Sequence, residues 1–271
     1  MLQTITQSDM LRAAFLRPQL RTSRLQSLWS TLHRLSLWGM NIGPAGKLSE
    51  SGEDWVLAQA MQTNPAASPF VLFDVGANAG HYAQGALAHS NPALKLYCFE
   101  PSTPTFQRLS ANLAGAGQAK LFQFGFSDAE SESILHYHTG GEAEASLYHR
   151  DLSHWGIDQC ETTSVRLQRL DTFCGQQGVG QIDFLKIDVE GHEVAVLEGA
   201  GAMLSSGAIR KIQFEFGGPD IESRTFFKDI YRILNPHYQL YRIVYQGLEP
   251  IPVYSEFLET FLTVNYLAVA R

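Results

Sequence analysis

The stretch that decides the fold is Phe70-Val-Leu-Phe-Asp-Val-Gly-Ala-Asn-Ala-Gly80. Its first half is an apolar run of strand length that ends in a carboxylate, Asp74. Its second half is a turn of small residues that leads into a helical pattern. A buried strand, a tight glycine-containing turn and a helix in this order are typical of a nucleotide-binding parallel sheet. The stretch therefore predicts the first βα unit of such a sheet, with room for a ligand beside the turn.

The same alternation of apolar runs and helical patterns continues to the end of the chain. Strands are expected at residues 70–74, 94–100, 119–124, 182–188, 211–216, 238–244 and 263–269. Helices are expected at residues 80–89, 103–113, 192–200 and 222–234. Most of these strands are apolar on both faces, which indicates burial under helices on either side. The sequence therefore predicts an α/β fold with a central, mostly parallel seven-stranded sheet and helices on both faces.

The segment before this sheet has a different character. Residues 1–66 are predicted to form an N-terminal helical extension, and residues 67–271 a single ligand-binding domain. Residues 1–49 carry six Lys or Arg and one Asp, and apolar residues recur at helical spacing from Leu25 to Trp38. Three roles stay open for this basic amphipathic helix: packing on the domain, dimerisation, and peripheral contact with a membrane. A second helix is expected to begin at Ser51.

Composition limits the classes of function and partner. The 271 residues include 20 Lys and Arg and 27 Asp and Glu, a formal charge of -7. This balance argues against a nucleic-acid partner and favours a small molecule or a sugar. Cys98, Cys160 and Cys174 match neither a disulfide framework nor a zinc site, and no apolar run reaches the ~20 residues of a membrane-spanning helix. We therefore expect a cytoplasmic protein, with peripheral membrane contact as an alternative.

The turn after the first strand limits which class of ligand can bind. A dinucleotide-binding fingerprint requires glycine at the first, third and sixth positions of the turn, which here are Gly76, Asn78 and His81. The pattern that cradles a pyrophosphate is therefore broken. What remains, with Asp74 and Gly80 framing the turn, suits a ligand that carries an amino-acid cation and an adenosine. S-adenosyl-L-methionine is such a ligand, and Asp74, Gly76, Asn78 and Gly80 are its predicted contacts.

Carboxylates also follow the next two strands. Glu100 ends the second strand, and an ionised carboxylate there can accept two hydrogen bonds from a ribose diol. Ser127 and Asp128 follow the third strand, where a side-chain carboxylate and a backbone amide can bind an adenine through complementary donors and acceptors. Glu100, Ser127 and Asp128 therefore join the predicted cofactor site.

The fourth strand ends in Asp188, and Glu190 and His192 follow it. Methyl transfer from a sulfonium is an in-line displacement in which an acceptor hydroxyl loses its proton, so a nearby base assists. Asp188, Glu190 and His192 are the predicted catalytic residues, and the choice of base among them stays open. An alternative is that Asp188, Glu190 and Glu215 bind a divalent cation through oxygen ligands.

The motifs around these strands resemble the signature of the FkbM-type methyltransferases. The resemblance is carried by residues 182–200, Ile-Asp-Phe-Leu-Lys-Ile-Asp-Val-Glu-Gly-His-Glu-Val-Ala-Val-Leu-Glu-Gly-Ala, and by Phe73-Asp-Val-Gly-Ala-Asn-Ala-Gly-His-Tyr82. Shorter matches bring its extent to roughly residues 70–270; they lie at residues 98–101, 126–128, 145–147, 167–172, 214–215 and 265–268. It implies a Rossmann-like class I methyltransferase fold and O-methylation of a hydroxyl on a sugar, glycolipid or secondary metabolite.

The resemblance also assigns roles to individual residues. Asp74, Gly76 and Gly80 correspond to the cofactor loop, Glu100 to the ribose ligand, Asp128 to the adenine contact, and Asp188 to the residue beside the transferred methyl. Residues of the acceptor site cannot be carried over in this way.

Two other functions compete with methyl transfer. A nucleotide-dependent oxidoreductase could use a similar sheet, but Asn78 and His81 argue against it. A non-catalytic cofactor-binding module would make the residues around Asp188 a structural turn. In the middle of the chain, residues 133–138 and 163–170 are expected as extra strands, and the polar stretch 139–161 as a loop over the active edge of the sheet.

Overall fold

The computed structural model describes residues 18–43, 47–62, 69–89, 91–138, 141–153, 156 and 161–271. The chain divides into two compact units, one ending at Gly43 and one beginning at Pro44. The first contains the 3₁₀-helices η1 (Pro18–Arg21) and η2 (Ser23–Leu25) and the α-helix α2 (Gln26–Gly39), which confirms the predicted N-terminal helix. The indole N–H of Trp29 donates a 2.6 Å hydrogen bond to the carbonyl of Leu20 and so ties α2 to η1. Across the described ranges, no helix is both long and apolar enough to cross a membrane.

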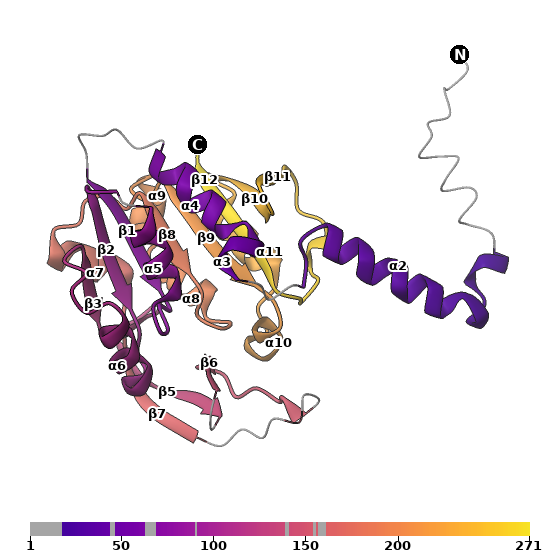
Figure 1. The fold of residues 1–271 in the computed structure, drawn as a ribbon, viewed down its shortest axis with the longest axis horizontal. Helices are drawn as coiled ribbons and strands as arrows, with labels where there is room; N and C mark the ends of the chain where they lie inside the picture. Colours follow the sequence, from indigo (N-terminus) through magenta and orange to yellow (C-terminus); the bar gives the residue numbers. More distant parts are fainter. Residues whose placement is uncertain are drawn as a thin grey trace, which may run out of the picture. The chain divides into compact units, whose positions relative to one another are not determined.

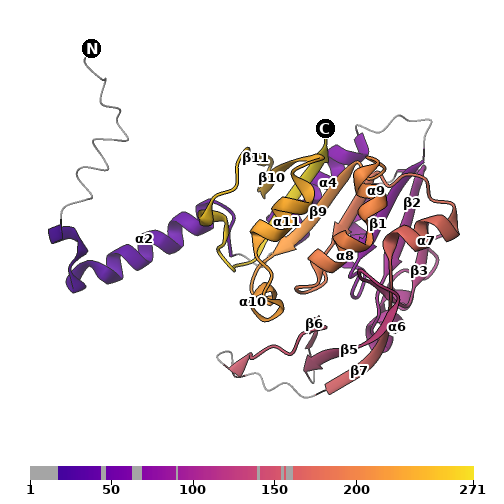
Figure 2. The same ribbon diagram turned by 180° about the vertical axis from the view of Figure 1, so that it is seen from behind.

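The second unit is built on an eight-stranded sheet in the order β11-β10-β12-β9-β8-β1-β2-β3 (Figures 1 and 2). In chain order its strands are β1 (Phe70–Val75), β2 (Leu94–Phe99), β3 (Ala119–Phe122), β8 (Phe184–Ile187), β9 (Lys211–Phe216), β10 (Tyr238–Val244), β11 (Gly247–Ile251) and β12 (Val264–Ala270). The five strands from β3 to β9 in this order run parallel, and β12 is antiparallel to both of its neighbours. The predicted Rossmann-like, mostly parallel sheet is confirmed.

The predicted number of seven strands is wrong by one, because β11 was missed. β11 forms an antiparallel hairpin with β10, in which Val244 pairs with Gly247. Its sequence Gly-Leu-Glu-Pro-Ile shows no apolar alternation and contains Pro250, which argues against a central strand. An edge strand tolerates proline because one of its sides has no hydrogen-bonded neighbour.

Helices cover both faces of the main sheet, as predicted (Figures 1 and 2). One face carries α3 (Leu48–Ser51), α4 (Glu53–Gln62), α5 (His81–Ala88) and α6 (Thr103–Asn112). The opposite face carries α7 (Leu170–Gln177), α8 (Glu193–Gly199), α9 (Gly201–Ser205) and α11 (Phe227–Leu234). Side chains of β1 pack against both helical layers, because successive side chains of a strand point to opposite faces of the sheet. Leu72 joins the buried cluster of α4 and α5, and the ring of Phe73 lies 5.8 Å from that of Phe173 on α7.

Helix α4 belongs to the larger unit, which therefore begins earlier than the boundary predicted between residues 66 and 67. Val56 and Leu57 are buried in the same apolar cluster as β1 and β2, so burial ties this helix to the sheet. The helix begins at Glu53, later than predicted, because Gly52 adopts a left-handed conformation (φ +89°) after α3 ends at Ser51.

The predicted helix at residues 222–234 is two helices, α10 (Pro219–Ser223) and α11. Arg224, with φ +58°, lies in the left-handed region and breaks the helix between them. Helices α7 and α9 and the 3₁₀-helix η4 (Glu256–Leu258) were not predicted.

A second, four-stranded sheet lies beyond the main one, in the order β4-β7-β5-β6 (Figure 1). Its strands are β4 (Gly125–Phe126), β5 (Ser131–His138), β6 (Gly141–Ser146) and β7 (Glu161–Gln168). The two extra strands predicted in this region are confirmed as β5 and β7. The stretch between them, predicted as a loop, begins with strand β6, which pairs antiparallel with β5. The rest of the predicted loop includes residues 154–155 and 157–160, which lie outside the described residues.

Candidate active site

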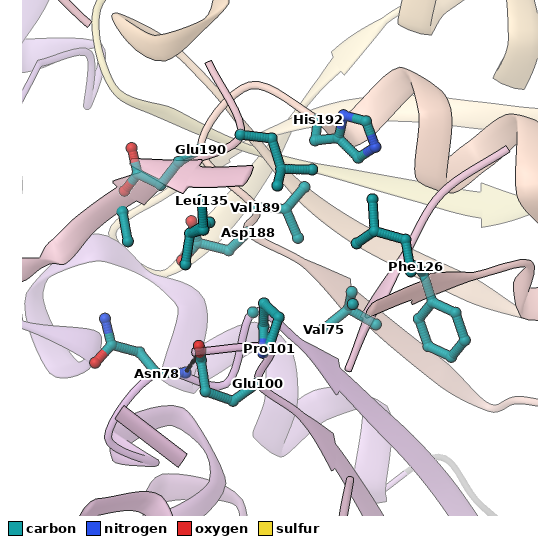
Figure 3. Close-up of a pocket in the computed structure, with 15 residues that line it drawn as sticks. Val75, Asn78, Glu100, Pro101, Phe126, Leu135, Asp188, Val189, Glu190 and His192 are labelled. Atoms are coloured by element: carbon teal, nitrogen blue, oxygen red, sulfur yellow. Dashed lines mark hydrogen bonds between the residues drawn. The ribbon is translucent and has the colours of Figure 1, made fainter. Parts of the chain in front are cut away.

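A pocket lies where the carboxyl ends of β1, β2 and β8 meet the second sheet; it holds about 700 Å³, its open mouth included. The main sheet and its turns supply Val75, Gly76, Asn78, Glu100, Pro101, Asp188, Val189, Glu190 and His192. The segment from Gly125 through the second sheet supplies Gly125, Phe126, Leu135, Ala145, Leu147 and Leu167. Figure 3 shows Asn78 and Glu100 on one side and Asp188 and Glu190 on the other. The pocket therefore has two polar sides and an apolar cover.

Six predicted residues line this pocket: Gly76, Asn78, Glu100, Asp188, Glu190 and His192. Five other predicted residues do not: Asp74, Gly80, Ser127, Asp128 and Glu215. The structure thus brings together Glu100, which follows β2, and Asp188, which follows β8.

Glu100 is held by the backbone. Its Oε2 accepts a 3.1 Å hydrogen bond from the N–H of Asn78, and its Oε1 accepts one of 2.8 Å from the N–H of Ser102. The residue is 7% exposed, and burial raises the pKa of Glu100 from 4.5 to about 7, although the two backbone donors act in the opposite direction. Each oxygen keeps a further lone pair, so the carboxylate can still accept both hydroxyls of a diol.

The turn after β1 is shaped by contacts within the protein. Gly76 has φ +80°, and a Cβ there would collide with the carbonyl oxygen of Asp188, so this glycine allows the ends of β1 and β8 to touch. Asn78, with φ +46°, is also left-handed, which asparagine tolerates better than most residues, and its Oδ1 accepts a 2.6 Å hydrogen bond from the N–H of Ala79. Gly80 (φ +90°) serves packing, because a Cβ would come within 2.8 Å of Leu109 on α6.

A buried row of polar residues crosses the main sheet beneath the pocket. In register, Asp74 on β1 pairs with Lys186 on β8, which pairs with Gln213 on β9. Gln213 donates a 2.7 Å hydrogen bond to Oε1 of Glu53 on α4, and the hydroxyl of Tyr82 donates one of 3.1 Å to Gln213. The row therefore connects α4 and α5 to β8, the strand that precedes Asp188.

Lys186 is the cation of this row. Its Nζ lies 3.1 Å from Oδ2 of Asp188 and 3.4 Å from Oδ1 of Asp74, which is fully buried. Burial acts to lower the pKa of Lys186, but Asp188, Asp74 and Glu53 raise it above its ordinary value, so the amine stays charged. Burial raises the pKa of Asp74, and Lys186 opposes that shift. Asp74, predicted as a cofactor contact, is fully buried outside the pocket lining and holds the lysine that positions Asp188.

Asp188 and Glu190 have different surroundings. The side chain of Asp188 is 36% exposed at the pocket, where its carboxylate can meet a ligand. Glu190 is paired with a different cation, because Nη1 of Arg150 donates a 3.1 Å hydrogen bond to its Oε2. The hydroxyl of Ser146 at the end of β6 donates to the backbone carbonyl of Glu190 at 2.7 Å. Glu190 therefore fastens the segment after β6 to the loop that carries Asp188.

His192 lies in a chain of hydrogen bonds. Its Nε2 is 2.9 Å from Oγ of Ser127, and its Nδ1 is 3.0 Å from the hydroxyl of Tyr148. Ser127 donates at 2.9 Å to Asp128, so its oxygen is left to accept from Nε2–H, and Nδ1 accepts from Tyr148. Burial lowers the pKa of His192, which keeps the ring neutral at neutral pH. Both ring nitrogens are therefore engaged.

Asp128 lies on the exposed side of this chain and outside the pocket. Arg169 donates hydrogen bonds to the carbonyl of Asp128 and, at 3.2 Å, to that of Glu198 on α8. The loop after β4 is thus bound to the helix that follows Asp188. This loop supports the pocket, and the adenine contact predicted for Asp128 is not part of its lining.

Buried and half-buried carboxyl groups lie near Asp188. Burial raises the pKa values of Glu193, Glu215 and Asp220, the last to about 7, and neighbouring carboxylates raise those of Glu193 and Glu215 further. Among the residues that the structure describes, no group of three or more His, Cys, Asp or Glu is arranged to hold a metal ion. The alternative cation site at Asp188, Glu190 and Glu215 therefore gains no support from the geometry.

Three important residues were missed by sequence reasoning. Lys186 carries a signal, because it is a charged residue within an otherwise apolar buried strand between Asp183 and Asp188. Arg150 and Tyr148 carry no such signal, since both lie in a polar stretch about 40 residues from their partners. Only the path of the second sheet brings them to Glu190 and His192.

The sequence matches the model of the methyltransferase FkbM domain over residues 74–243, and the chain belongs to this family of methyltransferase domains. Membership confirms the resemblance found in the motifs. Over 145 residues the chain is 28% identical to the 2-O-methyltransferase NoeI of Sinorhizobium fredii, covering 50% of this chain and 59% of that protein. Over 174 residues it is 33% identical to the AMB antimetabolite synthetase AmbE of Pseudomonas aeruginosa, covering 53% of this chain and 8% of that protein.

A third relative is the methyltransferase sdnD of Sordaria araneosa, 28% identical over 162 residues that cover 50% of this chain and 62% of that protein. The matches thus span less than two thirds of each of these relatives. Solved structures with a similar chain path include the precorrin-6y C5,15-methyltransferase of Geobacter metallireducens (TM-score 0.44, 9% identity, 84% of this chain and 93% of that one). Another is an S-adenosylmethionine-dependent methyltransferase of Agrobacterium tumefaciens (TM-score 0.44, 9% identity, 82% and 62%).

Proposed function

We propose that this chain is an S-adenosylmethionine-dependent O-methyltransferase that methylates a hydroxyl of a sugar, glycolipid or secondary metabolite. One observation carries the proposal: in a member of a methyltransferase family, Glu100 and Asp188 face the same pocket from the ends of two parallel strands. The printed name of one relative, a 2-O-methyltransferase, supports a hydroxyl as the acceptor.

The residues of the pocket fit the cofactor. Glu100 keeps lone pairs for a ribose diol, and the left-handed turn at Gly76 and Asn78 brings backbone close to the ligand space. When bound, S-adenosylmethionine supplies a methyl group activated by a sulfonium. The pocket carries three carboxylates, Glu100, Asp188 and Glu190, and this lining suits a cationic ligand.

Asp188 is our candidate for the base that takes the proton of the acceptor hydroxyl. It is the carboxylate of the β8 loop that is open to the pocket and unpaired with Arg150, and Lys186 fixes its orientation. His192 is neutral, but both of its nitrogens are engaged with Ser127 and Tyr148. Glu190 is paired with Arg150. Of the three predicted catalytic residues, the geometry favours Asp188.

Calorimetry with S-adenosylmethionine and with NAD tests the proposal against the oxidoreductase alternative. We expect binding of the first and none of the second, because the turn lacks the glycines that admit a pyrophosphate. Binding of NAD alone would reject the proposal. Transfer of tritiated methyl from the cofactor to candidate glycans separates an enzyme from a non-catalytic module, and Asp188→Asn should lower transfer far more than cofactor affinity.

A further inference from the structure

Within its own unit, helix α2 leaves an apolar stripe uncovered. Leu28, Leu32, Leu35 and Trp38 are 49%, 45%, 59% and 72% exposed, and no residue of the helix is buried. Their spacing of four, three and three residues places them along one side of the helix. Solvent-exposed leucines at successive turns are unusual for a soluble helix, and a contiguous apolar surface of this kind marks an interaction site.

The charge of the same segment is uniformly positive. Residues 10–43 contain no Asp or Glu, and the part of them that the structure describes carries Arg21, Arg24 and Arg34. The chain as a whole has a formal charge of -7, so this segment differs in sign from the rest. At 100° per residue, Ser30 and His33 lie on the side of α2 away from the leucines, where both are exposed. An apolar stripe, a polar back and flanking cations therefore occur together.

We propose that α2 is a docking helix for a lipid surface that carries anionic headgroups. Such a surface matches both the apolar stripe and the cations. The leucines and Trp38 would be buried at the boundary of headgroups and acyl chains, and the arginines would pair with the anionic headgroups. A pair of α2 helices from two copies of the chain would also cover the leucines. It would, however, bring like charges together without a counter-charge on either helix. The inference is independent of the reaction at the pocket.

Vesicle flotation of the full chain tests this inference. The probes are vesicles of phosphatidylcholine alone and of phosphatidylcholine mixed with phosphatidylglycerol, each at low and high salt. We expect flotation with the mixed vesicles at low salt, and a loss of about tenfold in bound protein with neutral vesicles or at high salt, where charges are screened. Failure to float with the mixed vesicles at low salt would overturn the proposal.

Matched variants separate the stripe from non-specific charge effects. Leu32→Glu and Leu35→Glu place a charge in the stripe, whereas Ser30→Glu makes a similar change in charge on the opposite side of α2. Flotation should be lost in the first two and largely kept in the third. Equal behaviour of all three would reject the stripe as the contact. A dimer by light scattering that Leu32→Glu dissociates, without binding of wild type to vesicles, would show that a second copy covers it. Unchanged circular dichroism confirms that each variant folds.

Discussion

The two polar sides of the pocket hold their carboxylates by different means. On one side, Glu100 is fixed by the backbone N–H groups of Asn78 and Ser102. On the other, Asp188 and Glu190 are fixed by the side-chain cations of Lys186 and Arg150. A backbone donor is kept in every substitution except one to proline, but side-chain cations can be removed singly. The position of Asp188 can therefore be disturbed by replacing the cation that holds it. The Glu100 side of the pocket is best tested by replacing Glu100 itself.

The largest effect is expected from Lys186→Met. This change leaves the fully buried Asp74 without its cation, and loss of one partner from a buried ion pair costs about 3–5 kcal/mol of unfolding free energy. It also frees Asp188, so turnover should fall more than cofactor affinity. Denaturant unfolding measures the first effect, and the kcat of the folded variant, assayed well below its unfolding midpoint, measures the second.

Two variants control this prediction. Lys95→Met removes a lysine from an exposed position of β2 and should change neither quantity. Lys186→Met combined with Asp74→Asn should recover part of the stability, because the buried charge is then gone, but not the turnover, because Asp188 is still unpositioned. Full turnover in this double variant would show that Lys186 acts on stability alone.

Glu100→Gln tests the other side of the pocket and should have a smaller effect. The amide keeps the shape of the carboxylate but loses one acceptor, so cofactor binding should weaken by ~1–3 kcal/mol. At saturating cofactor, kcat should stay close to that of wild type, since Glu100 and Asp188 lie on opposite sides of the pocket. Calorimetry gives the affinity, with the exposed Glu132→Gln as the control. A fall in kcat without a change in affinity would contradict the division of the pocket into two sides.

The raised pKa of Glu100 predicts that stability and cofactor affinity change in opposite directions as pH rises. Because the pKa of Glu100 rises from 4.5 to about 7 on folding, its contribution to stability is complete below 4.5 and is lost as pH rises through about 7. Cofactor affinity should change the other way and increase through the same range, because only the ionised form accepts both hydroxyls. Melting curves and calorimetry from pH 5 to 9 measure both trends. Glu100→Gln should remove the pH dependence of affinity near 7; an unchanged profile would assign it to another group.

Much of the fold and half of the site follow from local patterns. Strand runs predicted the parallel sheet, and because parallel strands end at one edge, Glu100 and Asp188 were expected to meet. The contacts that hold the site residues in place could not be predicted from local patterns. The pairing of Asp74 with Lys186 depends on the register of two strands more than 100 residues apart in the chain. Arg150 contacts Glu190 only because the second sheet carries it there. Strand β11 was not predicted because it contains Pro250.

The smallest expected effect comes from Tyr148→Phe, which asks whether His192 belongs to the catalytic side or only supports it. Removing the hydroxyl takes away the donor to Nδ1 of His192 while Ser127 still accepts from Nε2, so we expect a stability loss of ~0.5–1.5 kcal/mol. If Asp188 is the base, the pH profile of kcat should keep its shape in this variant. If His192 is the base, loss of the Tyr148 donor would raise the pKa of the ring and shift the profile to higher pH, whereas Ser127→Ala removes the acceptor of Nε2–H and would shift it to lower pH. Parallel pH–rate curves for the wild type and both variants therefore decide which residue on this side of the pocket handles the proton.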